Sequence, residues 1–372
     1  MGYCRSIVLL AVLAFASGCV GNRQSVETEV SRVRCDEYNL EEGSQDIVSS
    51  VDYLVLDISD GELLGQIDKV VVSDKKIYVG DYKNQKVFVF DEVGRMQGAL
   101  NKRGRGPGEY LKMRSFSVAN GRVYVLDDYE FTVLSYDAET LSYLESVKSP
   151  VFACDFSALW DGGFLFAYAP PSGNLVSDPD KRYRVVVTDA DMRIRQRYFP
   201  YKEDEVDALT FWQYLSESGG NLVYGTFRED GYCLFSRQDG HLEEHVAFDF
   251  TRPLPESDRS SLQAVVERKY NYMMKVPVIS GNHVVFDISS KDAAGTCVYN
   301  REGGQFLGQR QGEINHMLVG IIGSVGNSLI GNWGQKTNYE NLVRNGFDRA
   351  GREEEEAILA DNPFLVYYRL KE

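Results

Sequence analysis

The sequence predicts an all-β protein, a six-bladed β-propeller, because it contains a gapless internal repeat with strand periodicity. KIYVGDYKNQKVFVFDEVG (76–94) aligns with RVYVLDDYEFTVLSYDAET (122–140) at an offset of 46 residues. Each segment contains two runs of alternating apolar and polar residues around a polar turn, which is the pattern of half-buried antiparallel strands. Units of about 45 residues with four strands each are typical of propeller blades.

Looser copies of the unit follow these two. They include FLFAYAPPSGNLVSDPDKRYRVVVTDADM, NLVYGTFREDGYCLFSRQDG, HVVFDISSKDAAGTCVYNREGG, and SLIGNW with FLVYYRLKE. One anchor residue in the third strand of each unit gives six units: Phe90, Tyr136, Thr188, Phe235, Tyr299 and Tyr368. An ordinary β-sandwich, the alternative for an all-β chain, would not produce a gapless self-match. We therefore predict six blades.

A further strand is expected ahead of the first blade. DYLVLDI (52–58) is not needed by any of the six units, whose inner strands begin from Asp68 onward. Propellers commonly close their ring by pairing such a strand with the last blade. We predict that 52–58 pairs with the C-terminal FLVYYRLKE, which would remove an exposed sheet edge.

Two short helical insertions interrupt the strand pattern. In ESDRSSLQAVVERKYNYMMK (256–275) apolar residues recur near helical spacing, and Ser260 with Gln263 can form a capping box. GREEEEAILA is the second helical stretch. We expect both to pack against the rim of the propeller. The alternative is that they form a partner-docking surface on one face of the ring.

The amino terminus predicts export and a lipid anchor. The apolar run IVLLAVLAFA follows Arg5 and is too short to span a bilayer permanently, so residues 1–18 are predicted to be a signal peptide. The small residues of ASGC resemble a lipobox, in which Cys19 would carry the lipid and anchor the protein without spanning the membrane. The alternative is a soluble secreted protein. We expect a polar lipidated tether over 19–45 and the propeller over 46–372.

The composition excludes nucleic acid as a partner. The formal net charge is −15, whereas phosphate contacts need clustered Lys and Arg. With 43% hydrophobic residues and 12% aromatic residues, the chain can bury a large core.

The segment NKRGRGPGEY (101–110) is the strongest candidate for a phosphate-binding loop. A P-loop requires Gly-x4-Gly-Lys-Ser/Thr, and a dinucleotide fingerprint requires Gly-x-Gly-x-x-Gly at the start of a helix. Neither spacing is present. Pro107 also removes an N–H donor, and Glu109 adds negative charge where a phosphate would bind. We therefore predict that 101–110 is an architectural loop.

Two other apparent features, a zinc-peptidase pattern and a pair of cysteines, lie in a sequence context that does not suit a metal site or a disulfide. His241 and His245 fit the His-x-x-Glu-His pattern of inverted zinc peptidases, but the sequence around them predicts a hairpin and an outer strand instead of a helix. We therefore expect no metal and no cofactor. Cys233 and Cys297 occupy equivalent strands of neighbouring blades, where packed sheets are about 10 Å apart, and a disulfide between them is not expected.

A family resemblance is carried by three segments: GQIDKVVVSDKKIYVGDYKNQKVFVFDEVGRM, RGRGPGEY and the terminal DNPFLVYYRLKE. They resemble the six-bladed β-propeller lipoproteins of gut-type Gram-negative anaerobes, relatives of NHL-repeat propellers. The resemblance implies that Asp81 accepts backbone N–H bonds in a turn and that Asn84 takes a left-handed conformation there. It also implies that 101–110 crosses from the outer strand of one blade to the inner strand of the next. The resemblance does not imply a particular activity, because most such proteins are known by their fold only.

The resemblance also bears on location. Surface-exported lipoproteins of such bacteria usually carry an acidic cluster just after the lipidated cysteine. Val20-Gly21-Asn22-Arg23 lacks one. The expectation is therefore an outer-membrane lipoprotein that faces the periplasm, with the membrane as a partner through its anchor.

The fold class predicts where a ligand would bind. Propellers commonly hold ligands at the mouth of the central channel, near the starts of the inner strands. The residues expected there are Asp68, Arg114, Phe152, Trp212, Lys275 and His316. Their mixture of aromatic, cationic and acidic side chains suits a polar ligand such as a sugar or a peptide. The alternative is that they are ordinary packing and rim residues.

Two functional classes remain open. The first is a non-catalytic binding or scaffold lipoprotein that presents its loops to a glycan, a peptide or a protein in the cell envelope. The second is a lactonase-like propeller hydrolase with a central divalent metal. The hydrolase would need acidic and amide ligands from several inner strands, and only Asp68 is an obvious acid among the expected channel residues. We therefore favour the binding class.

Overall fold

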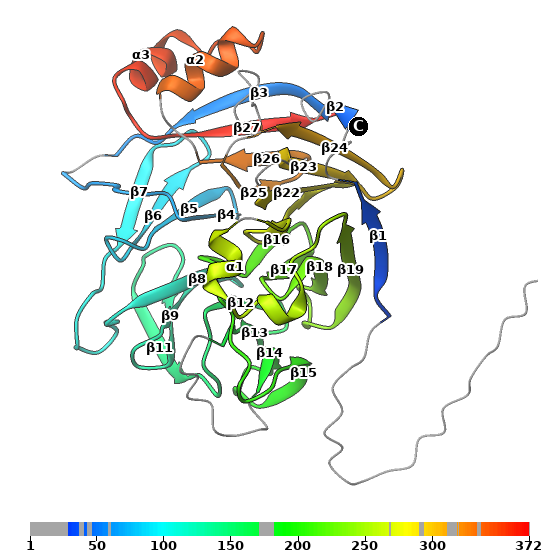
Figure 1. Ribbon diagram of the computed structural model, residues 1–372. Helices are drawn as coiled ribbons and strands as arrows, with labels where there is room; N and C mark the ends of the chain where they lie inside the picture. Colours follow the sequence, from blue (N-terminus) through cyan, green and yellow to red (C-terminus); the bar gives the residue numbers. More distant parts are fainter. Residues whose placement is uncertain are drawn as a thin grey trace, which may run out of the picture.

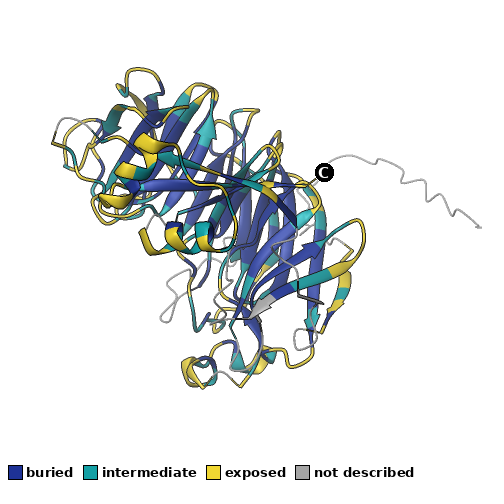
Figure 2. Ribbon diagram, turned by 90° about the horizontal axis from the view of Figure 1, so that it is seen from above, coloured by how far each residue is buried: buried dark blue, intermediate teal, exposed yellow. Residues whose placement is uncertain are grey.

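Six β-sheets are arranged around a common axis in this computed structural model (Figure 1). The structure describes residues 29–36, 41–42, 47–58, 61–170, 182–267, 269–289, 294–310, 318, 320–332 and 336–371. Each sheet is a blade whose faces pack against its neighbours, and the buried residues lie along the strands between the blades (Figure 2). The predicted six-bladed propeller is confirmed.

The first three blades have four antiparallel strands each. Blade 1 contains β4 (Lys69–Ser73), β5 (Lys76–Asp81), β6 (Lys86–Asp91) and β7 (Met96–Leu100). Blade 2 contains β8 (Met113–Ala119), β9 (Arg122–Asp127), β10 (Thr132–Asp137) and β11 (Tyr143–Lys148). Blade 3 contains β12 (Asp155–Ala158), β13 (Phe164–Ala167), β14 (Tyr183–Thr188) and β15 (Ile194–Pro200).

The last three blades incorporate strands from the amino-terminal part of the chain. Blade 4 contains β16 (Leu215–Ser218), β17 (Asn221–Thr226), β18 (Glu229–Ser236), β19 (Leu242–Phe250) and β1 (Ser31–Cys35). Blade 5 contains β20 (Tyr272–Met273), β21 (Val278–Ser280), β22 (His283–Ser289), β23 (Ala294–Asn300), β24 (Gln305–Arg310) and β2 (Glu41–Glu42). Blade 6 contains β25 (Ile321–Val325), β26 (Ser328–Gly331), β27 (Phe364–Leu370) and β3 (Val48–Val55).

The ring closes through β3, as the sequence predicts. β3 is the outer strand of blade 6 and pairs antiparallel with β27, with Val51 opposite Tyr368. The strand lies over 48–55, slightly earlier than the expected 52–58. The six predicted anchor residues all lie in the third strands of their blades, in β6, β10, β14, β18, β23 and β27.

Part of the segment expected to be a polar tether belongs to the propeller. β1 pairs in parallel with β19, the fourth strand of blade 4, and Cys35 lies opposite Phe250. Cys35 is fully buried and Val33 packs against the same core cluster. The alternation of SRVRC is therefore that of an edge strand, and β1 covers the otherwise open edge of β19. Cys19 and the predicted signal peptide lie outside the described residues.

The turns between second and third strands confirm one implication of the family resemblance and correct another. The Asp81 carboxylate accepts N–H bonds from Asn84 at 2.9 Å and from Gly65 at 2.7 Å. In blade 2 the carboxylate of the equivalent residue, Asp127, likewise accepts backbone N–H bonds in the corresponding turn. The left-handed residue is Gln85, with φ 60°, and not Asn84.

The helical predictions are partly correct. α1 (Leu262–Val266) falls within the first predicted insertion, but it is a single short helix that follows one turn of 3₁₀ helix (Glu256–Asp258). Its N-cap is Ser261, whose hydroxyl accepts the N–H of Ala264, one residue later than the predicted cap. α3 (Arg352–Leu359) matches the second prediction.

The sequence analysis missed α2 (Lys336–Arg344), which packs with α3 on blade 6 through Tyr339, Leu342 and Ile358. The apolar positions of α2 are few, and this explains why no helical pattern was recognised. Within the described ranges, no helix has both the length and the apolar character needed to cross a membrane.

Candidate functional site

One end of the ring carries the connections between blades, and we call it the connection face. It is built from the connections 101–112, 201–214 and 251–277 and from the turns between second and third strands, such as 82–85 and 227–228. The inner strand of each blade starts at this face. α1 belongs to the 251–277 connection and lies in front of the inner strands in Figure 1.

The axis of the propeller is closed by a buried ion pair. Lys69 Nζ of blade 1 lies 3.5 Å from Asp155 Oδ1 of blade 3, and both side chains are almost fully buried. Ser115 Oγ of blade 2 donates to the same carboxylate at 2.5 Å. The other oxygen, Asp155 Oδ2, accepts the backbone N–H groups of Tyr214 and Leu215 in blade 4 at 2.9 and 3.0 Å. Asp155 therefore joins four blades at the centre of the ring.

Among the described residues, a small cavity lies at the axis. It has a volume of about 30 Å³ and lies between Lys69, Leu215 and Gly323. Gln213 Nε2 donates to the carbonyl oxygen of Asp68 at 2.7 Å and so bridges blades 4 and 1 above this cavity.

Five of the six residues expected at the channel mouth lie in the described part of the chain, and two of them, Asp68 and Arg114, both lie close to Tyr82. The Asp68 carboxylate accepts the N–H of Tyr82 at 2.8 Å, and burial raises its pKa. Lys275 forms an ion pair with Asp287 at 2.6 Å within blade 5. Arg114 lies on β8, and His316 lies outside the described residues.

The two aromatic residues of that set are exposed on the connection face. Phe152 packs edge to face on Phe131 of blade 2, with ring centroids 4.7 Å apart. The Trp212 residue is 76% exposed, and its neighbours Phe211 and Gln213 are held by the core and by blade 1 respectively.

Replacement of Trp212 by alanine is expected to leave the fold intact. An exposed side chain contributes less than about 0.5 kcal/mol to the free energy of unfolding, whereas a core aromatic contributes about 3–5 kcal/mol. The adjacent Phe211 is buried, so Phe211→Ala is the matched control and should be strongly destabilising. Equal losses of stability in denaturant titrations of the two variants would show that Trp212 packs in the core.

A cavity lies away from the axis, beside blade 4. It has a volume of about 520 Å³ and opens on the connection face. We call it the blade 4 cavity. Its walls come from β14, β15, β17, β18, β19, β1 and the 201–214 and 251–277 connections. The lining side chains used below are Arg32, Arg184, Phe199, Glu205, Tyr224, Arg228, Glu229, Asp230, Tyr232, Cys233, His245, Phe248, Asp249, Glu256 and Arg259.

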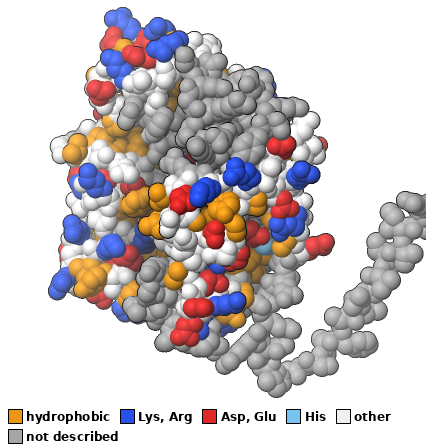
Figure 3. Space-filling model, viewed as in Figure 1, with side chains coloured by type: hydrophobic (Ala, Val, Ile, Leu, Met, Phe, Trp, Pro, Cys, Tyr) orange, Lys and Arg blue, Asp and Glu red, His pale blue; other side chains and the backbone are white. Residues whose placement is uncertain are grey.

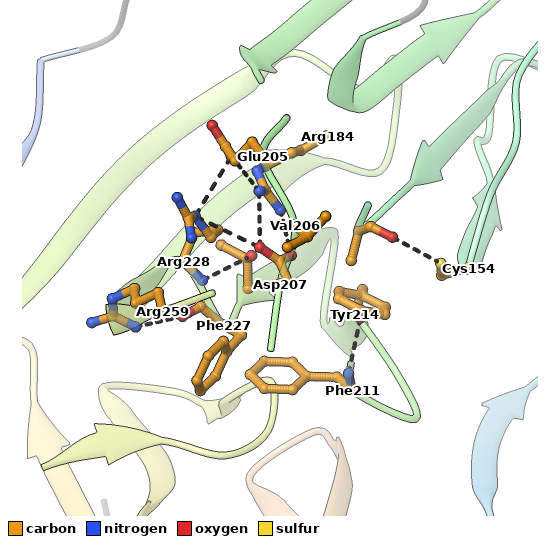
Figure 4. A network of polar contacts seen from close by, with 12 residues as sticks. Cys154, Arg184, Glu205, Val206, Asp207, Phe211, Tyr214, Phe227, Arg228 and Arg259 are labelled. Atoms are coloured by element: carbon orange, nitrogen blue, oxygen red, sulfur yellow. Dashed lines mark hydrogen bonds and ion pairs between the residues drawn. The ribbon is translucent and has the colours of Figure 1, made fainter. Parts of the chain in front are cut away.

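Arginines and carboxylates are paired along one wall of this cavity (Figure 4). Arg184 holds Asp207 through two hydrogen bonds of 2.7 and 3.0 Å and reaches Glu205 at 2.6 Å. Burial opposes the charge of Arg184, but the bonds to Asp207 outweigh it and its pKa is raised. Arg228 Nε lies 3.5 Å from Glu205 and 3.6 Å from Asp207. The pairing fixes these side chains and cancels most of their charge.

A second pair supports the floor of the cavity. Arg259 Nη2 lies 2.6 Å from Asp230 Oδ2, and the other carboxylate oxygen accepts the N–H of Met273 at 2.7 Å. Burial raises the pKa of Asp230, and the charge of Arg259 opposes that shift. This pair holds the 251–277 connection against the start of β18.

Two polar groups in the wall have no hydrogen-bond partner among the described residues. They are the hydroxyl of Tyr224 and Nη1 of Arg228, and both atoms are buried. Tyr224 is only 1% exposed and stacks on Phe199 with ring planes 8° apart. Buried polar groups are normally hydrogen-bonded, so these two atoms are hydrogen-bonding groups that a ligand could use once a small shift of the cavity wall uncovers them.

His245 also lines this cavity, but it does not form the metal site suggested by its motif. His245 Nε2 lies 2.6 Å from Glu229, whereas His241 Nδ1 lies 2.7 Å from Asp239. The two histidines therefore contact different acids, Glu229 at the start of β18 and Asp239 in the β18–β19 turn. No group of His, Cys, Asp and Glu within the described residues is arranged to hold a metal ion. Burial raises the pKa of the nearby Cys233 thiol well above its ordinary value, and Cys233 and Cys297 are not joined in a disulfide.

The sequence analysis missed the blade 4 cavity because its residues come from distant segments. No local motif is shared by the four arginines of the cavity, Arg32, Arg184, Arg228 and Arg259. The sequence around each of them does not indicate a binding site. The one available signal was the density of paired charges in DKRYR, YKEDEVD and FRED.

Comparison with known proteins places this geometry in a family. A family described as 6-bladed beta-propeller, DUF5128, matches residues 22–305. The chain belongs to this family. Its fold is similar to a presumed exported protein from Bacteroides fragilis, with a TM-score of 0.72 and 18% identity, covering 92% of this chain and 100% of that one. A DUF4221 member from Bacteroides vulgatus aligns over 90% of this chain and 99% of its own, with a TM-score of 0.49 and 11% identity. No curated protein matches the sequence.

Proposed function

We propose that this propeller is a non-catalytic lipoprotein of the cell envelope that binds an oligosaccharide in the blade 4 cavity. The observation that carries the proposal is the unpaired Tyr224 hydroxyl and Arg228 Nη1 in the wall of a 520 Å³ cavity. A volume of this size is within the range of small-molecule sites. A protein partner or a peptide on the same face is the alternative occupant.

The chemistry of the walls favours a hydroxyl-rich, uncharged ligand. The guanidinium groups of Arg184 and Arg259 are already paired with carboxylates, so the cavity does not require a charged ligand. The paired guanidinium and carboxylate groups offer fixed donors and acceptors in a cavity that the rings of Phe199 and Phe248 also line. Sugar rings present hydroxyl groups at their edges and C–H groups on their faces, and this combination matches both features.

The charged group at the axis favours binding over a metal-dependent hydrolase. A lactonase-like enzyme would hold its cation where the inner strands converge. At that place Asp155 is bonded to Lys69, to Ser115 and to two backbone N–H groups. Recruiting Asp155 to a cation would leave these donors without their acceptor, and Lys69 would repel the metal.

The location in the cell envelope rests on the amino terminus and on one relative. The signal-like segment ends in Cys19, which we propose to be the lipid attachment site of an outer-membrane lipoprotein facing the periplasm. The similar propeller from Bacteroides fragilis is a presumed exported protein, and this supports export of the present chain.

The test is a screen of uncharged oligosaccharides against the mature protein, followed by calorimetric titration of the Tyr224→Phe variant with the best ligand. Loss of one hydrogen bond to the ligand should weaken binding about 10-fold, which corresponds to about 1.4 kcal/mol. The melting temperature should stay the same or rise, because the variant removes a buried hydroxyl that has no partner.

The matched control is Tyr198→Phe. The Tyr198 hydroxyl is bonded to Gln196 at 2.7 Å and does not line the cavity. This variant should bind like the native protein and be slightly less stable. Equal affinities of both variants, or a screen in which only peptides bind, would refute the oligosaccharide proposal.

A further inference from the structure

A second hollow lies on the connection face between blades 1 and 2. Its volume is about 440 Å³, and four cationic side chains line it together with Tyr129: Lys83, Arg103, Arg105 and Lys112. We call it the basic groove. Its residues come from the β5–β6 turn, the 101–112 connection and the β9–β10 turn, so it is distinct from the blade 4 cavity.

The cations of the groove differ from most others in the molecule because they are largely unpaired. Lys112 lies 3.0 Å from Asp128. Among the described residues, no carboxylate forms an ion pair with Lys83, Arg103 or Arg105, and all three are exposed. Concentrated positive charge is unusual in a chain with a formal charge of −15. Figure 3, which shows the connection face, has Lys and Arg side chains over the blades on the left of the view.

The walls of the groove are rigid. The Gln85 carboxamide accepts the N–H of Met113 at 2.6 Å, and the Tyr110 hydroxyl donates to the Gln85 carbonyl at 2.6 Å. These bonds tie the β5–β6 turn of blade 1 to the start of blade 2. The cations are therefore presented from a fixed backbone, which lowers the entropic cost of binding.

The backbone of the 101–112 connection is not available for a phosphate. The N–H of Gly106 donates to the Glu109 carboxylate at 2.7 Å, and the N–H of Glu109 donates to the Gly106 carbonyl at 3.0 Å. A single phosphate would therefore find side-chain cations but no cradle of N–H donors. The groove suits several anionic groups spaced along an extended molecule.

We propose that the basic groove binds an acidic polysaccharide. The unpaired Lys83, Arg103 and Arg105 would each meet a carboxylate or sulfate group of successive sugar units. Tyr129 is 63% exposed and can stack on the C–H face of a sugar ring between them. A polyanion without sugar rings would gain nothing from stacking on the Tyr129 ring. The net negative charge of the protein repels polyanions from the rest of its surface.

The experiment compares binding of four polymers to the full mature protein by biolayer interferometry. The polymers are polygalacturonate, heparin, uncharged dextran and poly-glutamate. We expect binding of polygalacturonate or heparin that weakens as salt rises, and the polymer that binds more tightly identifies carboxylate or sulfate as the preferred group. Dextran should not bind. Poly-glutamate binding as tightly as either acidic glycan would overturn the proposal in favour of an acidic peptide.

Variants separate the groove from the general charge of the protein. The triple variant Lys83→Gln, Arg103→Gln, Arg105→Gln should weaken acidic-glycan binding at least 10-fold. A control triple, Lys148→Gln, Arg193→Gln, Arg352→Gln, removes the same charge from exposed positions outside the groove and should change binding less than 2-fold. Equal losses in both triples would refute a specific site.

Tyr129→Ala completes the test. It should weaken acidic-glycan binding about fivefold with no change in the melting temperature, because the ring is exposed. Unchanged glycan affinity in this variant would contradict the stacking role and leave no argument for a sugar. Tyr224→Phe should not affect these measurements, so the groove and the blade 4 cavity are tested independently.

Discussion

Replacing Gly108 with valine is expected to lower the free energy of unfolding by about 2–5 kcal/mol, the combined effect of a left-handed backbone and of overpacking. Gly108 has φ +74°, a conformation that β-branched residues avoid. A Cβ at this position would lie 2.5 Å from Cγ and 2.7 Å from Cβ of Tyr143. These atoms are next to the backbone of β11 and cannot swing aside. Denaturant titration measures the loss.

Two variants in the same loop are the controls. Gly106 has no positive φ, and a Cβ there would lie 3.1 Å from the flexible Glu109 carboxylate, so Gly106→Val should be milder than Gly108→Val. Arg105 is exposed and unpaired, so Arg105→Ala should change stability by less than about 0.5 kcal/mol. If Arg105→Ala were the most damaging of the three, the loop would not be architectural.

Replacing Asp155 with alanine should be similarly damaging. Removing one member of a buried ion pair typically destabilises a protein by about 3–5 kcal/mol, because the other charge stays buried without a partner. Here Lys69 would lose its carboxylate, and two backbone N–H groups of blade 4 would lose their acceptor. Since Asp155 joins four blades, we expect a lower melting temperature for the whole ring.

A surface aspartate provides the comparison. Asp191 is exposed and pairs only with the exposed Arg193, so Asp191→Ala should have little effect. If the free energy of unfolding of Asp155→Ala were within about 0.5 kcal/mol of the native value, the role assigned to the axial ion pair would be contradicted.

The repeat in the sequence was sufficient to predict the fold because each blade is a local unit. Strand alternation and the 46-residue offset depend on neighbouring residues, so they can be recognised without knowledge of tertiary contacts. The ring closure by β3 followed from the same pattern. By contrast, β1 is only five residues long and pairs with a strand more than 200 positions away, so local alternation could not assign its partner.

The candidate sites were harder to predict because they depend on tertiary placement. Lys69 and Ser115 are equivalent by the repeat, but nothing in the sequence shows that Asp155 of the third blade completes the axial cluster. The charged loop 101–110 connects β7 of blade 1 to β8 of blade 2, as the family resemblance implied. Its neighbours in the groove, Lys83 and Tyr129, come from two other turns and were not connected with it.

The most direct test of the proposed function is a crystal structure of the mature protein with the uncharged oligosaccharide that binds most tightly in the glycan screen. We predict density for the sugar in the blade 4 cavity, with ligand oxygen atoms within hydrogen-bonding distance of Tyr224 Oη and Arg228 Nη1. Both atoms are buried and have no partner among the described residues. Density for the sugar elsewhere on the connection face, with the blade 4 cavity filled only by water, would contradict the proposal.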